Sequence, residues 1–171
     1  GSKDKAREQA AAIARIDPYQ GELGWALIAS SERNNAELEK RYQAALALNP
    51  DGWQALQGYA AFCLRRNRAD EAMEMVSRLT RLRPEDPRTH ELLGDALASK
   101  GREAESLRSY GDALALRPNY DTVIYKLGRF HERKGDLERA AELYARYLGL
   151  IKNGRWAAQA RAKLKQWGKE V

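Results

Sequence analysis

The sequence lacks most of the residue patterns that point to bound metals, membranes or sheets. It has one cysteine, Cys63, and two histidines, His90 and His131, so it cannot close an intramolecular disulfide and has no set of residues at metal-ligand spacing. It also has no apolar stretch near the ~20 residues that cross a bilayer, and no strand-forming run of valine, isoleucine and threonine. We therefore expect no metal, no membrane-spanning helix and no β-sheet.

Catalytic patterns are missing as well. There is no glycine-rich phosphate loop, no nucleophile motif and no carboxylate pair that stands out from the acidic background. Many Asp and Glu residues stand where they would favour helix starts or pair with arginine four positions away. We expect no enzyme activity, no cofactor and no small-molecule substrate.

Positive charge is concentrated at one end of the chain. The net charge is +6, and residues 152–171 hold six Lys or Arg against Glu170, which is +5 of that total. Such a tail, with Trp156 and Trp167, raises the question of nucleic-acid binding through phosphates and base stacking. Helical spacing of these tryptophans with Ala160 and Leu164 favours packing instead.

A fixed period is the most informative feature that is present. Pro50, Pro84 and Pro118 stand 34 residues apart, and they close the related phrases Ala-Leu-Ala-Leu-Asn-Pro, Leu-Thr-Arg-Leu-Arg-Pro and Ala-Leu-Ala-Leu-Arg-Pro. A period of this length is typical of a chain that stacks one helical hairpin after another. Such a geometry suits the binding of another protein.

Each period predicts two helices, each followed by residues that end it. In the unit that ends at Pro118, Leu93-Gly94 lies in a first apolar stripe that the pair Lys100-Gly101 ends as a C-cap. Tyr110 lies on the stripe of the second helix, and Pro118 ends it because proline lacks an amide proton and clashes with the preceding turn.

These residues resemble the tetratricopeptide repeat, in which Leu-Gly, a turn, Ala, an aromatic residue and a final Pro recur in that order. Leu127-Gly128, Ala140 and Tyr144 repeat the pattern. The resemblance implies an all-α, right-handed superhelical solenoid of antiparallel helix pairs, with about ten helices. It divides the chain into an N-terminal helix, four repeats and a capping helix, at residues 3–18, 19–52, 53–86, 87–120, 121–153 and 154–171.

The two ends carry further expectations. Residues 1–2, Gly-Ser without an initiator Met, look like a cloning remnant, so an upstream targeting sequence could be missing and the location stays open between cytoplasm and bacterial envelope. Residues 3–18 look like half of a preceding repeat. Trp156, Ala160, Leu164 and Trp167 form one apolar stripe on the expected capping helix.

The resemblance also places a binding surface on the concave face, which the first helix of each pair lines in this family. The residues aligned there are Gln54, Gln57, Ala61, Arg88, Glu91, Asp95, Thr122, Tyr125, Lys126 and Arg129. The cations would attract acidic ligand groups and Tyr125 would offer a flat apolar contact. Alternatively, Glu91 and Asp95 neutralise these cations as a solvated charge pattern.

The family's carboxylate clamp is absent, since its aligned positions do not supply the lysines and asparagines that the clamp uses; these positions are Gly24, Gln57, Gly58, Arg88 and Leu92. Six more arginines lie beside acidic residues, and we interpret them as a solvated rim: Arg65, Arg66, Arg68, Arg78, Arg81 and Arg83.

The expected function is a non-enzymatic adaptor that binds a peptide or helix of a partner protein. By resemblance to bacterial relatives, it would act in envelope, pilus or secretion-system assembly. Two alternatives stay open. One is an oligomerisation or regulatory module of a larger protein, and the other is a nucleic-acid accessory that uses the basic tail. For the adaptor, we expect reversal of Arg88, Lys126 and Arg129 to Glu to abolish partner capture without unfolding the chain.

Overall fold

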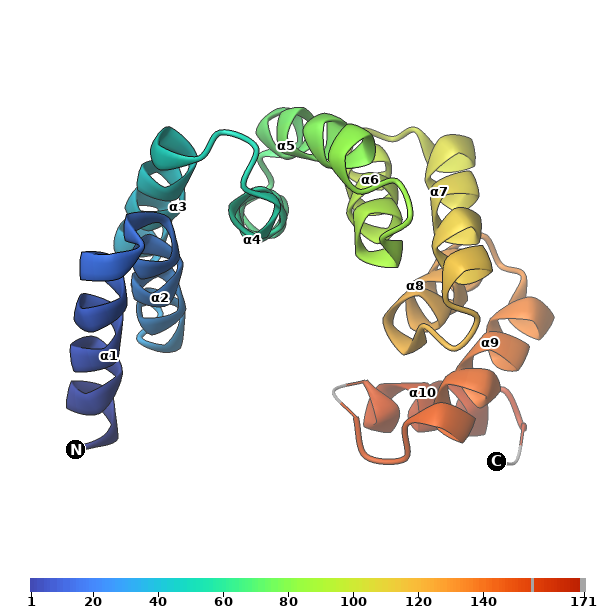
Figure 1. Cartoon of the computed structure of the whole chain (residues 1–171). Helices are drawn as coiled ribbons and strands as arrows, with labels where there is room; N and C mark the ends of the chain where they lie inside the picture. Colours follow the sequence, from blue (N-terminus) through green and yellow to red (C-terminus); the bar gives the residue numbers. More distant parts are fainter. Residues whose placement is uncertain (155, 170–171) are drawn as a thin grey trace.

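The fold is a curved row of helices (Figure 1). The computed structural model describes residues 1–154 and 156–169, which form ten α-helices and no strand, and the expected all-α solenoid is thereby confirmed. The helices are α1 Ser2–Ile16, α2 Pro18–Ser31, α3 Asn35–Leu48, α4 Trp53–Arg65, α5 Ala69–Leu82, α6 Pro87–Ser99, α7 Glu103–Leu116, α8 Asp121–Arg133, α9 Leu137–Leu150 and α10 Ala157–Gln166.

Neighbouring helices pack as hairpins, namely α2 with α3, α4 with α5, α6 with α7 and α8 with α9. In addition α1 packs on α2, and α10 packs on α9. Figure 1 shows the chain following an arch from α1 to α10, with the two termini at its opposite ends. None of the described helices has both the length and the apolar character that crossing a membrane would need.

Sequence features at the turns explain where the helices start and end. The side chains of Asp17, Asn34, Asp86 and Asp136 each accept a hydrogen bond from a backbone amide in the first turn of the helix that follows. Within the four hairpins, the turn passes through a left-handed residue at the same place in every repeat: Arg33, Asn67, Gly101 and Gly135, with φ of 56°, 60°, 73° and 78°. Glycine takes up this conformation without steric cost, whereas Arg33 and Asn67 do not.

The Leu-Gly pair of the repeat has a packing reason. A Cβ atom added at Gly94 would lie 2.5 Å from the ring of Tyr110, and one added at Gly128 would lie 2.7 Å from the ring of Tyr144. The tyrosine of each second helix therefore lies directly against the glycine of its first helix. Both tyrosines are buried, which fits the aromatic position of the repeat pattern.

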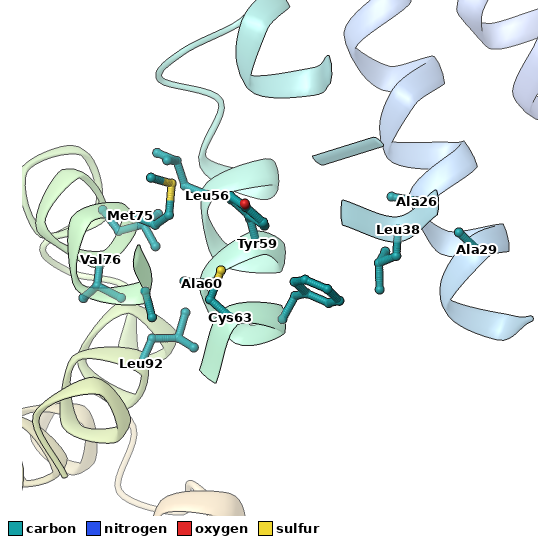
Figure 2. Close-up of a cluster of buried hydrophobic side chains, with 13 residues drawn as sticks. Ala26, Ala29, Leu38, Leu56, Tyr59, Ala60, Cys63, Met75, Val76 and Leu92 are labelled. Carbon is teal, nitrogen blue, oxygen red and sulfur yellow. The ribbon is translucent and has the colours of Figure 1, made fainter. Parts of the chain in front are cut away.

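The hydrophobic core runs along the solenoid between the first and the second helices of the hairpins. Figure 2 shows its N-terminal part, in which side chains of α4 lie between those of α5 and α6 on one side and those of α2 and α3 on the other. Cys63 is fully buried in this cluster. A separate cluster joins α8, α9 and α10 and includes Ile124, Tyr147 and Leu164.

The C-terminal stripe packs onto the last hairpin, as its spacing indicates. Ala160 and Leu164 are buried, the Trp167 ring stacks on Tyr144 at 5.9 Å between centroids, and the Trp156 ring precedes α10 and stacks on another tyrosine. The helix covers Ala157–Gln166, a shorter span than residues 154–171. Arg155 and Glu170 of the basic tail lie outside the described residues.

Candidate partner-binding groove

A groove of about 460 Å³ follows the concave side of the arch. The first helices of three hairpins, α4, α6 and α8, line most of it, and Ser106 and Tyr110 of α7 and the indole of Trp156 complete the wall. Seven of the residues aligned with the family's binding surface lie in this groove: Ala61, Arg88, Glu91, Asp95, Thr122, Lys126 and Arg129.

The two glutamines in that alignment do not line the groove and instead join neighbouring repeats. Gln54 accepts a hydrogen bond of 3.2 Å from the hydroxyl of Tyr19 in α2. The amide of Gln57 donates a hydrogen bond of 2.7 Å to Asp86, the residue that caps the start of α6. Both side chains therefore form hydrogen bonds between neighbouring repeats.

Tyr125 lies behind the groove wall. It is 4% exposed, its hydroxyl donates a hydrogen bond of 2.7 Å to Gln159, and its ring stacks on the indole of Trp156 with centroids 4.7 Å apart and planes inclined by 3°. Burial raises the pKa of its hydroxyl. The aromatic side chains that line the groove at this end are therefore Phe130 and Trp156, and the sequence offered Trp156 for packing or for base stacking rather than for the groove.

A buried carboxylate holds the centre of the groove together. Glu91 is fully buried, and it accepts hydrogen bonds of 2.5 Å from Lys126 in α8 and from Arg88 one turn away, with a third from the hydroxyl of Tyr120. Burial alone would raise the pKa of Glu91, but the charges of Lys126 and Arg88 outweigh it and the pKa is lowered. Glu91 is therefore held as an anion.

The same lysine links two carboxylates of α6. Lys126 donates a hydrogen bond of 2.6 Å to Asp95, which also accepts one of 2.6 Å from the hydroxyl of Tyr110. Glu91 and Asp95 do neutralise their neighbouring cations, but within a network whose centre is buried rather than on a solvated surface. Reversal of Lys126 to Glu would put three carboxylates together, so we no longer expect the triple reversal of Arg88, Lys126 and Arg129 to leave the fold intact.

Three arginines of the groove make no direct polar contact in the described part of the chain, although the charge of Arg129 acts on nearby Glu132. Arg65, Arg129 and Arg133 line the groove, and none of them forms a hydrogen bond or ion pair with any other residue in the ranges 1–154 and 156–169. From the sequence Arg65 is expected in a solvated rim, and Arg133 is not among the expected binding residues. The 34-residue period could have identified both, because positions 65, 99 and 133 are equivalent in three successive repeats.

The charge of the groove is positive. Five cationic side chains line it, namely Arg65, Arg88, Lys126, Arg129 and Arg133, against the two carboxylates of Glu91 and Asp95, which leaves a net charge of +3. Among the described residues no group of His, Cys, Asp and Glu is arranged to hold a metal ion. The arrangement offers cations and apolar surface to a ligand and provides no nucleophile beside a base.

Stacked helical hairpins around a lined concave groove define the class of helical-repeat scaffold proteins. The chain belongs to the tetratricopeptide repeat family, because two models described as tetratricopeptide repeat match residues 27–96 and 92–155. This fold is a scaffold for protein–protein interaction, and proteins of the family are generally non-enzymatic.

Two curated proteins are similar to part of this chain. The chain is 28% identical over 130 residues to Protein IFIT1 homolog B of Homo sapiens, an alignment that covers 71% of this chain and 27% of the relative. It is also 28% identical over 130 residues to interferon-induced protein with tetratricopeptide repeats 3 of Mus musculus, over 74% of this chain and 32% of the relative. The chain therefore spans about a third or less of these relatives.

Solved structures with the same fold include PilW and PilF. PilW, a type IV pilus biogenesis factor, superimposes with a TM-score of 0.80 at 20% identity, over 95% of this chain and 79% of PilW. PilF of Pseudomonas aeruginosa gives a TM-score of 0.73 at 18% identity, over 98% of this chain and 87% of PilF. At these identities the likeness shows the fold alone.

Proposed function

We propose that the protein is an adaptor that binds a segment of a partner protein in the concave groove of α4, α6 and α8. The observation that carries this proposal is the groove itself, which combines a net charge of +3 with apolar surface from Leu64, Leu92, Phe130 and Trp156. The similarity to PilW and PilF supports a role in assembling a larger structure, such as a bacterial pilus or envelope complex.

The hydrogen-bond network supports the proposal through rigidity. Lys126 joins α8 to α6 through Glu91 and Asp95, and Gln57 joins α4 to the start of α6. The three helices that line the groove are thus linked to one another before any ligand binds. A preformed site avoids part of the entropy cost of ordering, so more of the contact energy appears as affinity.

The adaptor hypothesis can be tested by filling the groove. Ala98 is an exposed residue of α6 that lines the groove, and Ala115 is an exposed residue of α7 that does not. We expect the wild-type chain and the Ala115→Trp variant to retain the same partner from a nuclease-treated extract of the source organism, whereas Ala98→Trp should lose it. Equal retention by both variants would refute binding in the groove.

Self-association is a second candidate, favoured by exposed apolar side chains at the N-terminal hairpin. Ile16 of α1 is 89% exposed and Leu27 of α2 is 72% exposed. Light scattering over a range of concentrations tests it, because an adaptor without its partner should stay monomeric. Dimers that a Leu27→Ser substitution dissolves would favour this candidate.

Nucleic-acid binding by the tail finds less support. The ring of Trp156 is stacked on Tyr125 and that of Trp167 on Tyr144, so base stacking would have to break these contacts. Lys163 also forms an ion pair of 2.6 Å with Glu132. These interactions use residues of the tail for packing on the last hairpin.

A further inference from the structure

The groove separates its cations into two groups. Arg88 and Lys126 both donate to Glu91, which is fully buried, and Lys126 also donates to Asp95, so these two cations are balanced by two carboxylates of the fold. The other three cations, Arg65, Arg129 and Arg133, have no such partner among the described residues. A ligand that approaches the groove therefore meets the positive charge of three side chains that no direct contact within the described chain holds. The carboxylate of Glu132 lies near Arg129 and Arg133, but it is itself paired with Lys163 at 2.6 Å.

We propose, building on the adaptor function, that the partner segment is acidic and that Arg65, Arg129 and Arg133 hold its carboxylates. These arginines do not stand at the positions aligned with the family's carboxylate clamp. An arginine side chain presents paired N–H groups that match the two oxygens of a carboxylate, so each can make a bidentate contact. We call these three residues the arginine edge.

The repeat places the arginine edge across the solenoid. Arg65 lies at the end of α4 and Arg133 at the end of α8, with Ser99 at the equivalent position of α6 between them. A segment that crosses the three helices therefore meets a cation, a hydroxyl and a cation, and Arg129 lies one turn before Arg133 on the same helix. This order favours a ligand whose carboxylates are separated along its length over one with a single charged end.

Cations at these positions also have a structural use, because the C-terminal end of a helix carries partial negative charge. That effect accounts for their place along α4 and α8. It gives no reason for the side chains to line the groove, where they lie together with Phe130 and Trp156. The apolar rings beside the cations indicate that the acidic segment also carries an apolar or aromatic residue.

The test is selection from a phage-displayed library of random peptides of about 12 residues, long enough to cross three helices at about 3.3 Å per extended residue. The targets are the wild-type chain, an edge variant (Arg65→Ser, Arg129→Ser and Arg133→Ser) and a control variant with the same loss of charge. The control replaces three exposed arginines outside the groove, which form no ion pair with described residues, by serine: Arg15, Arg81 and Arg108. Circular dichroism and thermal unfolding establish that each variant is folded.

We expect the wild type and the control variant to enrich peptides rich in Asp and Glu. A synthetic copy of an enriched peptide should bind the edge variant at least about tenfold more weakly than the wild type, since charge-assisted hydrogen bonds are lost, and should bind the control within about threefold. Its affinity for the wild type should fall as salt is added, because exposed charges are screened.

The other outcomes separate the two proposals. Peptides that lose binding to the Ala98→Trp variant need an open groove. If such peptides have no acidic bias, or still bind the edge variant, the acidic ligand is refuted and the adaptor function stands. Peptides that Ala98→Trp does not affect, or no enrichment at all, would refute binding in the groove and the inference with it. Tighter binding of an oligothymidylate than of any acidic peptide would overturn the proposal in favour of nucleic acid.

Discussion

Replacement of Lys126 by Met should destabilise the chain strongly, because it leaves a buried carboxylate with only one of its two cations. The Nζ atom of Lys126 lies 2.5 Å from an oxygen of Glu91, whose side chain is fully buried, and 2.6 Å from Asp95. Breaking a buried pair costs ~3–5 kcal/mol, and since Glu91 keeps Arg88 and Lys126 is one-quarter exposed, we expect a loss of ~2–4 kcal/mol. That loss corresponds to a fall in Tm of roughly 5–15 °C.

The penalty should depend on pH, and its sign follows from the pKa of Glu91. In the wild type the folded-state pKa is below its ordinary value, so ionised Glu91 stabilises the fold above about pH 4.3 and this contribution fades as pH falls further. Without Lys126, the charge of Arg88 alone opposes the effect of burial, so burial disfavours the ionised form of Glu91. The difference in stability between wild type and variant should therefore be full at about pH 7. It should shrink once pH falls far enough to protonate Glu91 in the variant, and should vanish only below the lowered pKa of the wild type.

Urea unfolding followed by circular dichroism measures this difference at each pH, with an unchanged slope as the sign that only stability has changed. The matched control is Lys134→Met, which removes an ion pair of 2.5 Å with Glu103 between side chains that are 51% and 45% exposed. Exposed pairs contribute about 0–1 kcal/mol, so this control should lose little. Equal losses for the two variants, or a loss from Lys126→Met that is the same at about pH 7 and pH 4, would refute the role given to Glu91.

Three further substitutions and one labelling reaction test the packing and the backbone strain. Gly94→Ala should lower the free energy of unfolding by ~1–3 kcal/mol, because its Cβ would meet the ring of Tyr110 at 2.5 Å. Gly111→Ala, with open space around it in α7, should raise the free energy of unfolding by about 0.5–1 kcal/mol. Thermal unfolding that ranks the two variants otherwise would contradict the packing. Arg33→Gly should raise the Tm by a few degrees, since a φ of 56° costs a non-glycine residue about 1 kcal/mol, and calorimetry that finds no gain would count against strain at this turn. Burial raises the pKa of the Cys63 thiol, so a thiol reagent should label it slowly in the folded chain and rapidly in urea; rapid labelling without denaturant would show that the cluster around it opens readily.

The fold could be predicted from the sequence because its information is local and repeated. Pro50, Pro84 and Pro118 mark the ends of three second helices, and the Leu-Gly pairs mark the places where a tyrosine ring packs on a backbone. Each signal needs only residues within one hairpin or its neighbour. The turns at Arg33 and Asn67 were harder to recognise, since neither has the glycine that the other two repeats place there.

The groove could be predicted only in part, because sequence position tells which helix a side chain belongs to but not what it contacts. Gln57 and Tyr125 stand at the aligned positions, yet their partners come from distant segments, Asp86 at 29 residues and Gln159 at 34. Trp156 was weighed for packing and for base stacking, and no repeat pattern indicated its place in the groove wall. Pairing between repeats is a tertiary property, and the period predicts its location without its partners.

Pairing also decides which charges are available for recognition. The chain has a net charge of +6, and sequence alone placed most of it in the tail, where Lys163 is paired with Glu132. In the groove, Glu91 forms ion pairs with Arg88 and Lys126. These two cations therefore make the site rigid, and their charges are less available to a ligand. Rigidity is thus supplied by residues of α6 and α8, and attraction by other residues, on α4 and α8. A substitution on the arginine edge should therefore change what the groove binds without loosening the helices that form it.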